Sequence, residues 1–342
     1  YQERPPILAT IYLVDGTVIM EDLSLTPDMN VAKVLEMCMG WLDLKDPRIN
    51  TLGMFVYDLG LIPRETDPTA AATYTDLRRT PRLLRGTHYM GDVVVQKSRQ
   101  RRLFKFVLKR KLFYPKDNYR GEDPFFERLT YLQAEDEAIN IGSMQPSTID
   151  EAQLLAALAL ELSTGGMPDS IGGMLDVGVA NYIAPHYRTL KTSREWAEAL
   201  LQLRDSLSDV DPSDLQQNFL QIVQECPMYG AHWFYVHLNS VEGAPDCITQ
   251  LPSDLLLAFN MDGMHIHTAV NRQHLYSIPY SNIYKWDGAA DQITLRMDWE
   301  GTGSSRAGNY VLQESDIVLI TAQAQDIADV IIEHIECIMG NK

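Results

Sequence analysis

Apolar and polar positions near the start of the chain follow the pattern of a β-hairpin and then a helix. Residues 7–14 alternate as a strand, Asp15-Gly16 supplies a two-residue turn, and residues 17–23 return as the partner strand. Thr26 is a candidate N-cap and Pro27 a first helical residue. The helix they open ends at Gly40, and its apolar stripe is Val31, Val34, Leu35 and Cys38.

Three more strands are expected in the same region, at 52–57, 92–95 and 104–109. The periodicity fails between residues 60 and 91, where prolines and arginines indicate loops. A hairpin, a helix and further strands in this order predict a β-grasp, the topology of ubiquitin.

The pattern then changes to helices. Asp123 caps a helix that has Pro124 at its first position, and Thr148 with Glu151 forms a capping box for a second helix that runs to about residue 162. Gly165-Gly166 stops that helix. Further helices are expected at 173–183, at 193–207 and from Asp211-Pro212 to a point before Pro227. Helices of this length with short connections predict a bundle.

After Pro227 the chain returns to strands. The first follows the proline directly, and the others are expected at 253–260, 264–268, 275–278, 283–286, 293–299 and 317–321. A final helix covers 324–339, with an apolar stripe of Ile327, Ile331, Ile335 and Ile338. Seven strands and a closing helix predict the sandwich of pleckstrin-homology and phosphotyrosine-binding domains.

Composition narrows the function more than the fold. The 342 residues carry a net charge of −17, which disfavours nucleic acid and anionic lipid as partners unless a basic patch stands apart. The four cysteines show no metal-ligand or redox spacing, so reduced thiols are expected. No signal peptide is evident, and the longest apolar run, 154–160, is far shorter than the ~20 residues of a membrane span. A soluble intracellular protein is expected, and a first residue other than Met suggests a fragment of a longer one.

One basic run stands out, because ten of the 29 basic residues lie within residues 97–120. It is either a solvated strand face that pairs with the acidic remainder of the chain, or a patch that binds phosphoinositide headgroups or an acidic peptide. The candidate anion-binding residues are Lys97, Arg99, Arg101, Arg102, Lys109, Arg110 and Lys111.

No pattern predicts an enzyme. His265 and His267 share one face of a strand with His274 close in sequence, but a full zinc ligand set is not evident, and exposed hairpin histidines are the simpler interpretation. The glycines of residues 301–309 lack the Gly-Lys-Ser/Thr of a phosphate loop. Catalytic residues, a metal site and a cofactor are therefore not expected.

Taken in order, the segments resemble a FERM domain, and in particular those that follow MyTH4 domains in myosin and kinesin tails. The resemblance is carried by the hairpin at 13–17, the basic strand and helical pair of 103–162, the proline–aromatic–glycine string at 227–230 and the string Ser281-Asn282-Ile283-Tyr284-Lys285-Trp286. It implies an α+β fold of three lobes: a ubiquitin-like lobe at 1–114, a helical lobe at 115–226 and a pleckstrin-homology-like lobe at 227–342.

The resemblance also implies a function. A non-catalytic module of a motor tail, of a myosin in preference to a kinesin, would bind the cytoplasmic segment of a cargo or adaptor protein by strand addition. The implied peptide site lies between an edge strand and the last helix, at Asn282, Ile283, Tyr284, Lys285, Trp286, Ala328 and Ile332. The alternative is a membrane-surface adaptor of the ezrin or talin kind that uses the basic run. Either implies a cytoplasmic, cytoskeleton-associated protein, at the membrane periphery in the second case, and the parent may carry a motor ATPase elsewhere.

Overall fold

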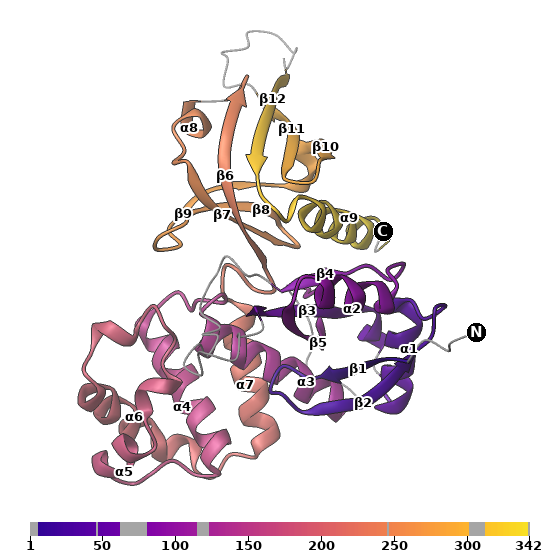
Figure 1. The fold of residues 1–342 in the computed structure, drawn as a ribbon. Helices are drawn as coiled ribbons and strands as arrows, with labels where there is room; N and C mark the ends of the chain where they lie inside the picture. Colours follow the sequence, from indigo (N-terminus) through magenta and orange to yellow (C-terminus); the bar gives the residue numbers. More distant parts are fainter. Residues whose placement is uncertain are drawn as a thin grey trace. The chain divides into compact units, whose positions relative to one another are not determined.

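The computed structural model describes residues 6–45, 47–61, 81–114, 123–244, 246–300 and 312–340 (Figure 1). Within these ranges the chain forms two compact units. The first contains the described residues before 62 and those of Leu83–Gly230, and the second contains residues 81–82 and the chain from Ala231 onward. The first unit holds a five-stranded sheet and a group of helices. The second unit holds a seven-stranded sheet and the C-terminal helix.

The sheet of the first unit has the order β2-β1-β5-β3-β4. Strands β1 and β5 run parallel, whereas β1 with β2 and β3 with β5 are antiparallel, as in a β-grasp. Its core is built from side chains of both sheet and helix that are fully buried, such as Ile11, Val34, Met54 and Leu108. The bounds are β1 (Ile7–Tyr12), β2 (Val18–Leu25), α1 (Val31–Trp41), η1 (Pro47–Thr51), β3 (Leu52–Leu61), β4 (Arg82–Leu84), α2 (Met90–Arg99) and β5 (Arg102–Arg110).

The sequence pattern was wrong at three places in this lobe. Helix α1 is capped by Asn30, whose Oδ1 accepts from the Lys33 backbone N–H at 2.9 Å, and not by Thr26. Residues 92–95 lie in the helix α2 and not in a strand, because Val93 packs into the core and outweighs the β propensity of a valine run. Within the expected loop region, residues Arg82–Leu84 form the short strand β4.

Helical residues 124–224 follow the expected caps closely. Asp123 accepts from the backbone N–H groups of Phe125 and Phe126, and both halves of the Thr148–Glu151 capping box are present. The expected helix at 173–183 is instead broken at Gly178, whose φ of 72° no regular helix allows. The elements are α3 (Pro124–Glu135), a π-helical turn η2 (Asp136–Ile141), α4 (Ile149–Thr164), α5 (Ile171–Asp176), η3 (Val179–Tyr182), η4 (Arg188–Leu190), α6 (Ser193–Leu207) and α7 (Pro212–Gln224).

Buried alanines explain how these helices pack so closely. Ala152, Ala156 and Ala159 on α4 are fully buried, and this helix packs against both α6 and α7. Small side chains let neighbouring helix axes approach, while Trp196 and Phe219 fill the space between them.

The second unit is a sheet of order β10-β11-β12-β6-β7-β8-β9 in which the strand pairs are antiparallel. The strands expected after Pro227 are all present, with ends that differ by a few residues. The bounds are β6 (His232–Glu242), α8 (Asp246–Thr249), β7 (Asp254–Asn260), β8 (Gly263–Thr268), β9 (His274–Ile278), η5 (Tyr280–Asn282), β10 (Ile283–Gly288), β11 (Gln292–Glu300), β12 (Leu312–Ile320) and α9 (Ala324–Gly340).

Candidate functional site

Strand β10 lies at one end of the seven-stranded sheet, so one side of its backbone has no neighbouring strand among the described residues. This is the edge that the resemblance to FERM domains implied. Ile283 is buried and Trp286 half-buried, whereas Tyr284 is 45% exposed and Lys285 is also exposed. Asn282, half-buried, ends the turn η5 that leads into the strand.

A β-bulge divides this edge. Ile283 pairs with Met297 and Lys285 with Arg296, so Tyr284 is an extra residue with no partner of its own in the ladder. Regular pairing then continues from Lys285 to Gly288. The sequence gave no sign of the bulge, and it makes Lys285–Gly288 the part of the edge that is regular enough to template another strand.

Helix α9 lies along β10 in the opposite direction. An added Cβ at Gly288, at the end of the strand, would lie 3.9 Å from the Ala324 carbonyl oxygen at the start of the helix. At the other end the Tyr280 ring, just before the strand, stacks on the His334 ring with centroids 5.7 Å apart. Tyr280 and His334 were not predicted, because periodicity does not distinguish a buried histidine on a helix from a surface one.

The two helix residues predicted for this groove differ in exposure. Ala328 is only 6% exposed and can offer a partner little surface, which corrects the expectation for that residue. Ile332 is half-buried and remains a candidate. Ile327 and Ile331 are fully buried, as expected for the core side of the helix.

Acidic side chains dominate the surroundings of the edge. Helix α9 contains four acidic residues and no Lys or Arg. Asp326 and Asp329 are buried, and Asp326 pairs with Arg82 Nε at 2.8 Å, whereas Glu333 is half-buried and Glu336 exposed. Desolvation, and then the carboxylates of Glu314 and Asp298, raise the pKa of Tyr284. The environment of β10 is therefore electronegative, although Lys285 and the Arg296–Asp316 ion pair lie within it.

The basic run is largely neutralised. Lys97 Nζ and Arg102 Nη1 both contact the Asp58 carboxylate, at 3.0 and 3.1 Å. Lys109 is buried and its Nζ lies 3.1 Å from Glu137 Oε1. These contacts match the alternative in which the run is paired with acidic residues elsewhere in the chain.

Arg110 is only 1% exposed, and its guanidinium lies 4.5 Å from the centre of the Phe113 ring. Neither Arg110 nor Lys109 can reach a lipid headgroup, which corrects their assignment to an anion-binding patch. Lys111 is half-buried, while Arg99 and Arg101 are exposed. Among the seven candidates, Arg99 and Arg101 are thus the exposed cations, while Lys111 and the ion-paired Arg102 are half-buried.

Of the three histidines on β8 and β9, His265 and His274 share a hydrogen-bond partner, and His267 has a separate one. His265 Nδ1 lies 2.8 Å from Ser277 Oγ and its Nε2 lies 2.9 Å from Asn260 Oδ1, while His274 Nε2 also meets Ser277 Oγ. His267 Nδ1 donates to the Arg272 carbonyl. Desolvation lowers the pKa of His265, and that of His267 to about 4.

In the part of the chain that the structure describes, no group of three metal-ligating side chains is assembled. Cys38 and Cys226 are buried and desolvation raises the pKa of each to about 12, so both are inert thiols. The residues 301–309 and the side chain of Cys247 lie outside the described residues. Among described helices, none is long and apolar enough to cross a membrane.

Comparison with known proteins gives a consistent result. A family model described as the FERM central domain matches residues 116–234. Kinesin-like protein KIN-14E of Arabidopsis thaliana is 26% identical over 216 residues, which cover 61% of this chain and 17% of that protein. This chain thus spans less than a fifth of that relative's length.

Solved structures of FERM domains share the fold. The MyTH4-FERM MF2 domain of Dictyostelium discoideum myosin VII has a TM-score of 0.69 at 13% identity, over 96% of this chain and 58% of that one. The human myosin 7b C-terminal MyTH4-FERM domain, in complex with the harmonin-a PDZ3 domain, has a TM-score of 0.65 at 16% identity, over 97% and 60%. The FERM and C-terminal domain complex of Drosophila Merlin scores 0.64 at 13%, over 97% and 96%.

The predicted fold class is therefore confirmed, whereas the lobe boundaries at 114 and 226 stay predictions. The β-grasp sheet, the helical group and the seven-stranded sheet with its closing helix together have the three-lobed fold of FERM domains, including those of the MyTH4-FERM structures.

Proposed function

We propose that this chain is a non-catalytic cargo- or adaptor-binding module of a motor tail, and that it binds an extended peptide along β10. The observation that carries the proposal is that β10 lies at the edge of the sheet, with helix α9 alongside it and running in the opposite direction. An extended peptide would pair with the backbone of Lys285–Gly288 and place alternate side chains toward α9 near Ile332.

The charges near the edge favour one kind of peptide. Glu333 and Glu336 of α9, together with Asp298, Glu314 and Asp316 of the sheet, outnumber the cations Lys285 and Arg296. A cytoplasmic peptide with Lys or Arg at alternate positions is therefore complementary, and its affinity should fall as salt rises.

The test is a selection of peptides from a random phage-displayed library against the whole chain. Selected peptides should bind Ile332→Glu at least tenfold more weakly, about 1.4 kcal/mol, because a carboxylate then stands in the groove wall. Val270→Glu is the matched control, since it makes the same kind of change at a side chain 98% exposed in the turn between β8 and β9. Peptides that bind all three proteins equally would remove the groove from consideration.

A backbone test separates strand addition from other contacts. Successive N–H groups of an edge strand point alternately to the neighbouring strand and to the open side. Trp286 and Asp287 are consecutive, so the N–H of one points to β11 and that of the other to the open side of β10. Of Trp286→Pro and Asp287→Pro, the variant that removes the open-side N–H should keep the circular dichroism of the parent and lose peptide binding. If the folded variant of this pair binds as the parent does, the peptide does not add to β10.

The membrane-surface alternative rests on fewer residues than the sequence suggested, namely Arg99, Arg101 and half-buried Lys111. The test is co-sedimentation with phosphoinositide-containing liposomes. We expect that changing Arg99 and Arg101 to Glu does not alter the amount of protein that binds the liposomes. Salt-sensitive binding that these changes abolish would instead support a lipid-binding role.

A further inference from the structure

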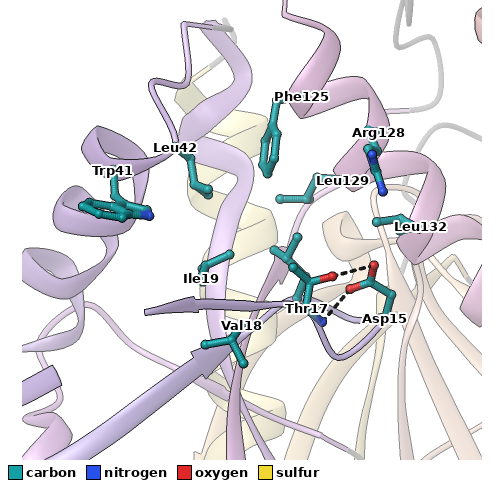
Figure 2. Close-up of a pocket in the computed structure, with 11 residues that line it drawn as sticks. Asp15, Thr17, Val18, Ile19, Trp41, Leu42, Phe125, Arg128, Leu129 and Leu132 are labelled. Atoms are coloured by element: carbon teal, nitrogen blue, oxygen red, sulfur yellow. Dashed lines mark hydrogen bonds between the residues drawn. The ribbon is translucent and has the colours of Figure 1, made fainter. Parts of the chain in front are cut away.

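A cavity with a volume of about 280 Å³ lies within the first unit (Figure 2). Its walls come from three segments distant in sequence: the β1–β2 hairpin, the C-terminal end of α1 and one face of α3. Leu13, Ile19 and Leu129 are buried side chains that make its floor apolar.

The rim is unusual for its exposed apolar surface. The Trp41 side chain is 73% exposed and Val18 is 47% exposed, both beside the cavity. Neither would be covered by a small molecule that only filled the cavity. Exposed apolar surface that adjoins a pocket, with Trp and Arg at its rim, is typical of the anchor region of a protein interface.

Backbone hydrogen bonds at the end of helix α1 fix the main chain around Trp41. The Leu44 N–H donates to the Met39 carbonyl and the Asp43 N–H to the Gly40 carbonyl, which is the bond pair of a Schellman motif, with Asp43 at φ 49° in the left-handed position. The backbone that carries the indole is therefore fixed, which lowers the cost of ordering this helix end when a partner binds.

The cavity lining contains one charged side chain of each sign, Asp15 and Arg128, and they differ in their partners. Asp15 accepts from the Thr17 backbone N–H through Oδ1 and from the Thr17 hydroxyl through Oδ2, both at 2.9 Å, so both of its oxygens are engaged within its own turn although its negative charge remains (Figure 2). Arg128 is exposed on α3 and forms no hydrogen bond or ion pair with the described residues. The donors left to a ligand are thus the Arg128 guanidinium and the Trp41 indole N–H.

We propose that this cavity is a second docking site, which takes an acidic-apolar segment of a partner protein. One bulky apolar side chain of the segment enters the cavity, and a neighbouring Asp or Glu pairs with Arg128. The cavity lies just below the lower bound of about 300 Å³ for small-molecule sites, which suits a side chain better than a cofactor. The partner's charge is opposite to that expected at β10, so the two sites bind different ligands.

The experiment is a selection of random 12-residue peptides against the whole chain, with Arg128→Glu as the counter-selected variant. We expect the enriched peptides to share a bulky apolar residue next to Asp or Glu. They should bind Arg128→Ala and Trp41→Ala at least tenfold more weakly, and Arg128→Lys should restore part of the affinity. Arg99→Ala and Leu190→Ala are matched controls, since they remove an exposed arginine and an apolar side chain 59% exposed elsewhere in the same unit.

Three outcomes would overturn the proposal. The first is that no enriched peptide loses affinity when Trp41 or Arg128 is changed. The second is that the peptides that do lose affinity are basic. The third is full displacement of the peptides by octanoate at the peptides' own concentrations, which would make the site one for a small carboxylic acid. Ile332→Glu should leave this binding unchanged, so failure here is distinguishable from failure of the β10 groove.

Discussion

The buried pair Lys109–Glu137 allows the interpretation of the basic run to be tested through stability. Lys109 Nζ lies 3.1 Å from Glu137 Oε1, which also accepts from Gln133 Nε2 at 2.9 Å, and the ammonium stands 4.6 Å from the centre of the Phe55 ring. The side chains of Lys109 and Glu137 are 11% and 9% exposed. Removing one partner therefore leaves a charge with little access to water.

We expect Lys109→Met to destabilise the first unit by about 3–5 kcal/mol, because Glu137 loses its cation while remaining buried. For a unit of this size that corresponds to a fall of roughly 6–20 °C in the unfolding midpoint. The double variant Lys109→Met, Glu137→Leu should recover most of the loss and lie within about 1–2 kcal/mol of the parent, since both charges are gone.

The assay is urea unfolding followed by circular dichroism at helix wavelengths for the parent, both single variants and the double variant. Arg99→Met is the control, because an exposed side chain in the same run should change stability by less than about 0.5 kcal/mol. A Lys109→Met loss below 1 kcal/mol, with additive effects in the double variant, would refute a buried structural pair and reopen Lys109 as a surface cation.

Two further predictions concern a histidine and a helix end. Because the pKa of His267 is lowered to about 4, the native state holds a proton less readily than the unfolded chain, which titrates near 6.5. The stabilising contribution of neutral His267 is present above pH 6.5 and is lost as the pH falls toward 4, by about 1–2 kcal/mol at pH 5. In thermal melts between pH 7 and pH 5, the unfolding midpoint of His267→Phe should therefore fall less than that of the parent. Equal falls in both proteins would count against this prediction. Asp43→Gly should raise stability by about 0.5–1 kcal/mol in urea melts, because glycine adopts the left-handed conformation at φ 49° without strain; an unchanged or lower midpoint would show that Asp43 carries no strain.

Local signals in the sequence were sufficient for many helix ends and strands. The Thr148–Glu151 capping box, the Asp123 cap and the bounds of α6 were predicted correctly, because their hydrogen bonds join residues only two to four positions apart. In β11 and β12, buried and less buried positions alternate with a period of two, which makes such strands recognisable, whereas β7 and β8 are buried almost throughout. The position of β10 at the sheet edge followed from resemblance and not from any local pattern.

Tertiary structure alone decided features that join distant residues. The run 93–95 is helical because packing against the core outweighs its strand propensity, and Lys109 is buried because its counter-charge Glu137 lies 28 positions further along. The cavity beside Trp41 is assembled from the hairpin, α1 and α3, which meet only when the sheet and the helices fold together. Burial and charge pairing depend on which segments meet in space, and hydrophobic periodicity carries no information about that for residues so far apart.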